Sequence, residues 1–438
     1  MNILFLSNRP TKNSQAATVT EYLDALGQFS KHRVFEVSML GRFPKKLDLS
    51  RFDVVLTHYS LSLGPLIQHY LGDDLIAQFR NFKGLKAAFL QDEYREIKTY
   101  WKNLNDIGID VLFSCVPDEE IRKVYPRSEV PNLSVQNVLT GYVPHSLTKQ
   151  DVLPVKDRPI DVGYRTRKMP YWLGALGREK VFIAEEFERL GTAKGLRLDL
   201  STKEGERLYG DAWTNFVASC RAVIGVESGA SIIDFDGKLE RKVDAYCAKH
   251  PNASFEEVSD LFLKPFEGSL RLHQISPRCF EAAALRTPMI LFEGTYSGVL
   301  QPDQHFIPLK KDFSNFDAVV EKLRDPKGLQ AMADRTYRDV ALNPEYSYQN
   351  FVKILDAVLE SERDARQAAR TLNPYNQKSF RQAVRTSWRY SIGRYAAMRL
   401  QSLLLGLPVA RKALFGLWYI LPQPLQRIAR PMARIISR

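Results

Sequence analysis

Residues 271–298, RLHQISPRCFEAAALRTPMILFEGTYSG, contain the local signals that decide the fold. Ser276 and Pro277 are typical of a helix start, because serine can accept a bond from a free backbone N–H and proline lacks the donor that would go unused there. The consecutive alanines that follow favour a helix over 277–286. Thr287 precedes a proline, which pushes it out of the helical region. The sequence therefore predicts a short helix with a defined start and end.

The segment after this helix reads as a strand and a turn. Residues 289–292 form a short apolar run of the buried-strand type, and 294–298 contain the glycine and serine residues of a turn. Parallel α/β sheets bind ligands at the carboxyl ends of their strands. Thr295 and Ser297 in this turn are therefore candidate ligand-binding residues.

The start of the 277–286 helix has the chemistry of an anion site. Free N–H groups and the helix dipole attract negative charge there, and Arg278 adds a positive charge. Glu281 lies three residues further on, so the two side chains share a helix face. A guanidinium beside a carboxylate can hold a phosphate and accept hydrogen bonds from a ribose diol. The alternative is an exposed salt bridge, which contributes little to stability.

Strand-like and helix-like segments alternate along most of the chain, which predicts an α/β fold with parallel, doubly wound sheets. The first strands are expected at 2–7, 33–38, 53–57, 86–90, 110–114 and 135–140, and helices at 18–29, 93–105 and 346–360. The expected organisation has a first α/β domain over 1–150, a second over 151–345, a crossover helix over 346–364 and a basic tail over 365–438.

The run HQISPRCFEAAALRTPMILFEG resembles the nucleotide-sugar-binding segment of GT-B glycosyltransferases of the family-4, or group 1, type and of their spore-maturation-protein-like relatives. In that family two glutamates separated by seven residues face the donor, and the second opens an E-A-x-A-x-G-x-P-like run. Glu281 matches the second glutamate. The first would fall at position 273, where this chain has His273.

The resemblance implies a GT-B fold, in which two Rossmann-like domains face each other across a cleft. It implies an enzyme that moves a sugar from a nucleotide-diphosphate sugar to a glycan or lipid-linked acceptor, with retention at the anomeric carbon and without a metal or cofactor. Glu281 would then hold the ribose, and His273 would contact the sugar. The alternatives are a nucleotide-sugar epimerase on the same fold and a catalytically quiet sugar-binding protein.

Two more strand ends in the second domain supply donor-binding candidates: Gly163, Arg165, Arg167, Lys168, Glu227 and Ser228. Glycine lets backbone approach a ligand, and a loop rich in cations suits a diphosphate, although a solvated basic turn would look the same. The resemblance implies that this basic loop contacts the diphosphate, where Arg165 would stabilise the leaving group. Glu227 and Ser228 could line the base or ribose pocket.

The first domain contains acceptor-side candidates. Asn8 lies in the loop after the first strand, which lacks the G-x-G-x-x-G fingerprint of dinucleotide binding. His58 follows the third strand and is either a proton shuttle or a hydrogen-bonded loop histidine. Asp92 and Glu93 follow the fourth strand. They could provide a base for an acceptor hydroxyl, or simply begin the next helix, where acidic residues suit the dipole.

Positive charge is concentrated at the end of the chain. Of 62 basic residues, fourteen lie in 365–438, which contains no acidic residue. Arg381, Arg385 and Arg389 recur every four residues, as in a basic stripe on a helix. Apolar residues such as Trp388 are interleaved, but no run reaches the roughly 20 that a membrane span requires. We expect this tail to bind an anionic membrane surface.

These features predict a cytoplasmic protein held at the inner face of the cell membrane. The first residues lack a signal-peptide pattern, and four scattered cysteines are typical of a reducing compartment without structural zinc. The D-x-D match at 234–236 is of a kind frequent by chance, so no metal is expected. Nucleic acid competes with lipid for a basic run. The apolar interleaving favours lipid, and we therefore expect no nucleic-acid partner.

Overall fold

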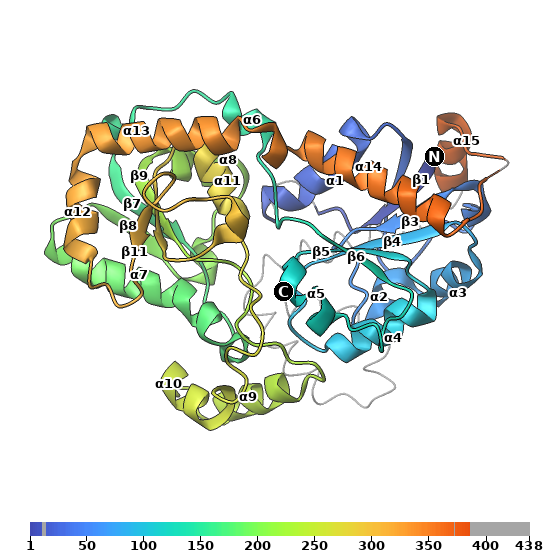
Figure 1. The fold of residues 1–438 in the computed structure, drawn as a ribbon, viewed down its shortest axis with the longest axis horizontal. Coiled ribbons are helices and arrows are strands. Elements are labelled where there is room, and N and C mark those ends of the chain that lie inside the picture. The colour runs from blue at the N-terminus through green and yellow to red at the C-terminus, as the bar shows by residue number, and fades with distance from the viewer. Residues whose placement is uncertain (11–14, 372, 386–438) are drawn as a thin grey trace.

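The computed structural model describes residues 1–438 except 11–14, 372 and 386–438. Two α/β lobes lie side by side (Figure 1). The first lobe has a six-stranded sheet of order β2-β1-β3-β4-β5-β6, and the second a five-stranded sheet of order β11-β10-β9-β7-β8. Strand pairs within both sheets are parallel. The doubly wound architecture expected from the sequence is confirmed.

The strands are short and lie close to the ranges predicted from the sequence. They are β1 Asn2–Ser7, β2 Arg33–Ser38, β3 Val54–Thr57, β4 Leu85–Leu90, β5 Val111–Ser114, β6 Ser134–Asn137, β7 Ile160–Arg165, β8 Leu198–Ser201, β9 Cys220–Gly225, β10 Met289–Phe292 and β11 Ile307–Leu309. In β1, Leu4 and Leu6 pack into one apolar cluster, whereas Ile3 and Phe5 pack into another. Both faces of this strand are therefore buried, as in other parallel sheets.

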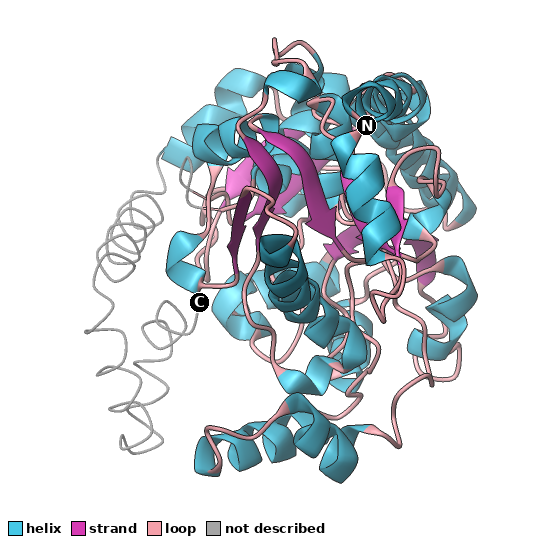
Figure 2. Ribbon diagram, turned by 90° about the vertical axis from the view of Figure 1, so that its left-hand side faces the viewer, coloured by secondary structure: helices cyan, strands magenta, loops and turns pink. Residues whose placement is uncertain are grey.

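Helices lie on both sides of the sheets (Figure 2). They are α1 Ala17–Phe29, α2 Ile67–Leu71, α3 Asp73–Asn81, α4 Ile97–Ile107, α5 Asp118–Val124, α6 His145–Thr148, α7 Ala175–Ala193, α8 Gly210–Ala218, α9 Lys238–Lys249, α10 Phe255–Val258, α11 Pro277–Ala284, α12 Phe316–Arg324, α13 Pro326–Thr336, α14 Tyr348–Ala365 and α15 Gln377–Arg385. Within the described ranges, none of these helices combines the length and apolarity needed to cross a membrane.

Helix α11 starts at Pro277 as predicted, but it ends at Ala284, before the predicted Arg286. Arg286 adopts a left-handed conformation with φ 47°. Its N–H donates to Ala283 O, while Thr287 N–H donates to Ala282 O. These two bonds form a Schellman motif, which ends the helix one turn before the proline can act.

The buried side chain of Arg158 fixes the carboxyl end of α11. Its guanidinium donates to the carbonyls of Leu285 and Arg286, to Cys220 O and to the hydroxyl of Thr287. Burial lowers the pKa of Arg158 to about 10, which leaves it charged at neutral pH. A cation at this position complements the negative end of the helix dipole, so it locks α11 against the sheet.

Helix α4 begins at Ile97, four residues later than predicted. Asp92 and Glu96 both have positive φ, of 63° and 51°, so the chain makes a turn after β4 rather than entering a helix directly. Such conformations are unfavourable for residues other than glycine. The polar segment after β4 is therefore a loop with a defined backbone conformation, at the carboxyl end of the strand.

The last described helices belong to the first lobe. Helix α14 extends from the second lobe across to α1 (Figure 1), where Asp356 accepts a 2.8 Å bond from the Ser30 hydroxyl. Tyr375 and Phe380 of the following segment are buried in the first-lobe core. A cut at residue 365 would therefore remove core packing, whereas residues 386–438, including Arg389 of the predicted stripe, lie outside the described part of the chain.

Candidate functional site

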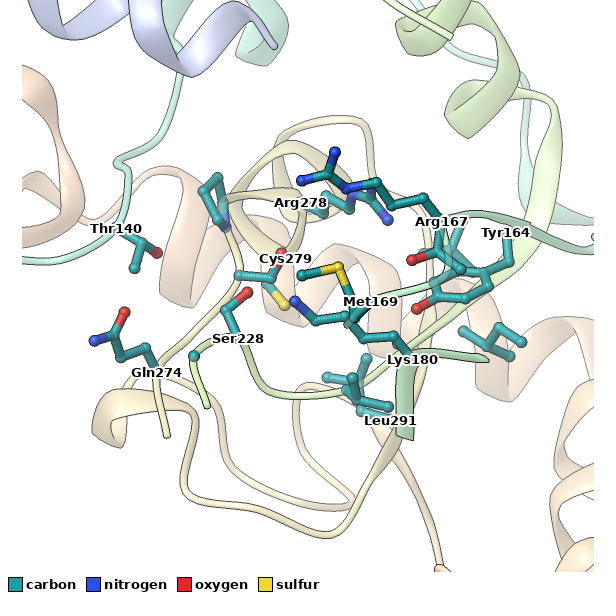
Figure 3. A pocket seen from close by; sticks show the side chains of 18 of the residues that line it. Thr140, Tyr164, Arg167, Met169, Lys180, Ser228, Gln274, Arg278, Cys279 and Leu291 are labelled. Atoms are coloured by element: carbon teal, nitrogen blue, oxygen red, sulfur yellow. The ribbon is translucent and has the colours of Figure 1, made fainter. Parts of the chain in front are cut away.

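A cavity of about 260 Å³ opens between the lobes, and we call it the first cavity. Its walls include the carboxyl ends of β7 and β9 and the first turn of α11 (Figure 3). The first lobe contributes Gln91, Asp92, Tyr94 and Thr140. The cavity thus lies at the strand ends where parallel α/β sheets bind ligands.

The second lobe provides four basic lining residues: Arg167, Lys180, Arg207 and Arg278. Arg207 pairs with Glu204 at 3.0 Å, and Arg167 lies 4.0 Å from the same carboxylate. Neither Lys180 nor Arg278 forms a salt bridge with any described residue. This wall of the cavity is therefore strongly cationic, a suitable environment for a diphosphate.

Lys180 is a site residue that the sequence analysis missed. It projects from α7 into the first cavity (Figure 3), and its ammonium makes no hydrogen bond within the described ranges. Burial, together with Arg278 and Arg167, lowers the pKa of Lys180 to about 8, while Asp92 acts in the opposite direction. The only sequence signal was its place on the helix that follows the basic loop.

The basic loop after β7 is divided between the cavity and the protein interior. Arg167 lines the cavity, but Lys168 is exposed outside its lining. The guanidinium of Arg165 points away: it bonds Asp199 at 2.7 Å and stacks 4.3 Å from the Phe216 ring. Gly163 is needed for packing, because a Cβ there would lie 2.3 Å from Cys220 Sγ. The structure therefore places Gly163 and Arg165 behind the cavity wall.

Arg278 and Glu281 are separated by a third side chain. Arg278 lines the cavity, donates to Arg165 O and lies 5.2 Å from the ring centroid of Trp213. Glu281 is only 6 % exposed, and its carboxylate accepts a 2.7 Å bond from Trp213 Nε1. The alternative of an exposed salt bridge is therefore wrong, and Glu281 lines neither cavity described here.

Glu227 and Ser228 have different surroundings. Glu227 is 5 % exposed and accepts bonds from the backbone of Thr295 and Tyr296, so it braces the turn after β10. Ser228 lines the first cavity and is bonded through its backbone to Gln274. The structure thus brings Ser228, but not the Glu227 carboxylate, to the cavity.

A second cavity, of about 300 Å³, lies beside the first. Its second-lobe wall contains Arg271, His273, Thr295 and Ser297, and its first-lobe wall contains Asp118, Glu119 and Asn137. Thr140 and Gln274 line both cavities, so the two meet there. Burial lowers the pKa of His273, which favours a neutral imidazole beside this junction.

Of the first-lobe candidates, only Asp92 lines a described cavity. His58 is fully buried, and burial lowers its pKa to about 3, so it stays neutral and is poorly placed as a proton shuttle. Glu93 points into the lobe, where it accepts bonds from Ser114 and Tyr125. Asn8 is anchored by a bond from its N–H to Ser60 Oγ.

The D-x-D segment has structural partners. Asp234 accepts a bond from the Glu240 N–H, and Asp236 pairs with Lys238 at 2.6 Å. Among the residues that the structure describes, no cluster of histidine, cysteine and acidic side chains could hold a metal ion.

Solved structures share this architecture at low sequence identity. One is an alpha-glucosyltransferase in complex with UDP-glucose and DNA containing an abasic site, and another is an alpha-glucosyltransferase with UDP and a 13-mer DNA containing an HMU base. Each has a TM-score of 0.50 and 10 % identity, over 82 % of this chain and 99 % of the other. No protein-family model and no curated protein sequence matches the chain.

The DNA in these two structures corrects one prediction. The apolar residues interleaved in the basic tail predict that the protein has no nucleic-acid partner. Two glucosyltransferases of similar fold nevertheless hold DNA. The exclusion fails because it rested on the tail alone, and a partner can also be recognised by the folded lobes. What the comparison shows for this chain is its fold, which is the GT-B fold of two facing Rossmann-like lobes.

Proposed function

We propose that this protein is a glycosyltransferase that uses a nucleotide-diphosphate sugar as its donor. The observation that carries the proposal is the pair of cations, Lys180 and Arg278, which face the first cavity without a carboxylate partner among the described residues. Unpaired cations in a partly buried site are costly unless an anion neutralises them. A diphosphate would do so, and its negative charge grows as the glycosidic bond breaks.

In this proposal, the first cavity binds the donor and the second cavity admits the acceptor. The diphosphate occupies the first cavity, and the sugar lies near the junction at Thr140 and Gln274. The acceptor enters from the second cavity, so that its hydroxyl approaches the sugar at this junction. Asp92 is the candidate base. Retention at the anomeric carbon and a glycan or lipid-linked acceptor stay predictions that rest on the resemblance.

The proposal is tested by incubating the purified protein with a panel of nucleotide sugars. We expect slow release of nucleoside diphosphate, which is accelerated by the correct acceptor. The acceptor panel contains methyl glycosides, lipid-linked sugars and DNA with hydroxymethylated bases. Conversion of the sugar without nucleotide release would indicate an epimerase, and binding without turnover would indicate a sugar-binding protein; either result would contradict the proposal.

We also propose that the protein acts at the cytoplasmic face of the membrane. Lys378, Arg381 and Arg385 are exposed on α15, opposite the buried Phe380. They continue into the basic sequence of 386–438. Sedimentation with anionic vesicles should require 386–438, and a truncation after Arg385 keeps the core packing of α15. Continued sedimentation of the truncated protein would contradict an anchor in this tail.

A further inference from the structure

Arg278 is held in place by a chain of ring contacts that reaches from β7 to α11. The guanidinium of Arg165 stacks on Phe216, and the Phe216 ring lies 5.9 Å from that of Trp213. Arg278 lies over the Trp213 ring, and its Nη1 donates a hydrogen bond to Arg165 O. Helix α8, which supplies both aromatic residues, therefore braces the cation that faces the first cavity.

Glu281 holds the Trp213 ring in this arrangement. It is one turn along α11 from Arg278, but it bonds the indole N–H of Trp213 rather than the guanidinium. Burial raises the pKa of Glu281, while the indole bond and the charge of Arg278 lower it. The buried carboxyl group is most stable when its oxygen stays on the indole, because breaking that bond would leave a buried acceptor unsatisfied.

We propose that Trp213 and Glu281 are a positioning pair, which holds the Arg278 guanidinium toward the donor diphosphate. Glu281 then acts through the indole ring and does not touch the ribose. The proposal rests on the function proposed above, and it gives a different role to the glutamate that the family resemblance places on the ribose.

The experiment measures binding of nucleoside diphosphates by calorimetry. The best ligand is chosen from ADP, CDP, GDP and UDP, and it is compared with its 2′,3′-dideoxy analogue. Trp213→Phe keeps a ring beneath Arg278 but removes the N–H donor. We expect about tenfold weaker binding for Trp213→Phe and for Glu281→Ala, since the same buried hydrogen bond is broken in each.

Two further results separate a positioning pair from direct contact. The double variant should bind about as weakly as either single variant, because both remove the same interaction. Glu281→Ala should reduce the binding affinity by the same factor for the ribose ligand and for its dideoxyribose analogue. If its loss disappears with the dideoxy analogue, Glu281 contacts the ribose hydroxyls and the proposal is overturned. Additive losses in the double variant would overturn it as well.

Glu281→Gln and Trp101→Phe complete the design. Glutamine still offers the indole an oxygen acceptor, so Glu281→Gln should lose less binding affinity than Glu281→Ala. An equal loss of affinity would contradict the proposal. Trp101 also donates through Nε1, to Val124 O at 2.8 Å, but in the first lobe. Its variant controls for the general effect of losing an indole bond. If no nucleoside diphosphate binds the wild-type protein, the proposed function itself fails.

Discussion

The two walls of the first cavity differ in charge. The second lobe contributes four cations, whereas Asp92 is the acidic residue that the first lobe contributes among the described lining residues. Asp92 also has a φ of 63°, an unfavourable conformation that the loop after β4 imposes. Strain at a ligand-facing residue indicates that its direction is fixed. In the proposed function, this difference corresponds to an anionic donor on the second lobe and an acceptor activated by the first.

The interiors behind the two walls differ as well. Behind Asp92 the ionisable groups are turned inward, and burial favours their neutral forms: it lowers the pKa of His58 to about 3 and raises that of Glu93 to about 7. In the second lobe, the buried Arg158 keeps its charge at the carboxyl end of α11, where backbone carbonyls and a hydroxyl accept its hydrogen bonds. The first lobe therefore presents one carboxylate to the first cavity, and the second lobe presents several cations.

The largest effect is expected from removing the negative charge of the first-lobe wall. Asp92→Asn should lower the rate of sugar transfer by about 100- to 10,000-fold, the contribution of a general base. Affinity for the donor should change far less than the rate, since Asp92 affects the diphosphate site only through its charge interaction with Lys180. Steady-state kinetics and calorimetry measure both. Asp106→Asn, an exposed change in the same lobe, is the control; an Asp92→Asn enzyme with normal transfer would remove Asp92 from the mechanism.

A second prediction concerns the neutral interior of the first lobe. Burial raises the pKa of Glu93 from its ordinary 4.5 to about 7, although bonds from Tyr125 and Ser114 oppose the shift. The folded protein therefore binds more protons than the unfolded chain between these values, so stability falls as the pH rises through this window. The loss should reach about 3 kcal/mol.

Chemical denaturation at pH 5 and pH 8 measures this loss, with Glu93→Gln as the comparison. Glutamine cannot ionise, so its stability should change less between the two pH values. An equal change in both proteins would show that other groups dominate. The comparison shows whether the inward-facing Glu93 carboxyl of the folded first lobe is protonated at pH 5 and ionised at pH 8.

Local signals explain what the sequence could predict. The start of α11 at Ser276 and Pro277, and the strand after Pro288, depend on neighbouring residues and were found. The end of α11 was placed too late, because a Schellman motif with arginine in the left-handed position has no distinctive sequence. The alternation of strands and helices also predicted the sheets, because short apolar runs in the sequence are typical of strands that are buried on both faces.

Long-range contacts explain what the sequence could not predict. The partner of Glu281 is Trp213, 68 residues away, and no spacing rule connects them. Lys180 looks like any lysine on an amphipathic helix until α7 is placed against the basic loop. Arg165 was expected in the cavity because it stands in a basic run, yet Asp199 on the neighbouring strand draws it away. The chemistry of these side chains is set by tertiary packing.

The last prediction tests the cationic wall itself. Lys180→Met should weaken binding of the nucleoside diphosphate by about ten- to a hundredfold, the value of a bond between charged groups. Lys194→Met is the matched control, because Lys194 lies at the other end of α7 and pairs with Asp317 on the surface. Equal affinities in calorimetry for both variants would show that Lys180 does not face the ligand.

The pH dependence of binding sharpens this result. Because burial and neighbouring cations lower the pKa of Lys180 to about 8, its ammonium is charged below this pH and loses its proton above it. Donor affinity should therefore be constant up to about pH 8 and then fall, by as much as tenfold per pH unit. Arginine keeps its charge throughout this range, so the fall should be absent in Lys180→Arg. A wild-type affinity that stays level to pH 9.5 would contradict an unpaired lysine at the diphosphate and would leave Arg278 as the principal anion-binding group.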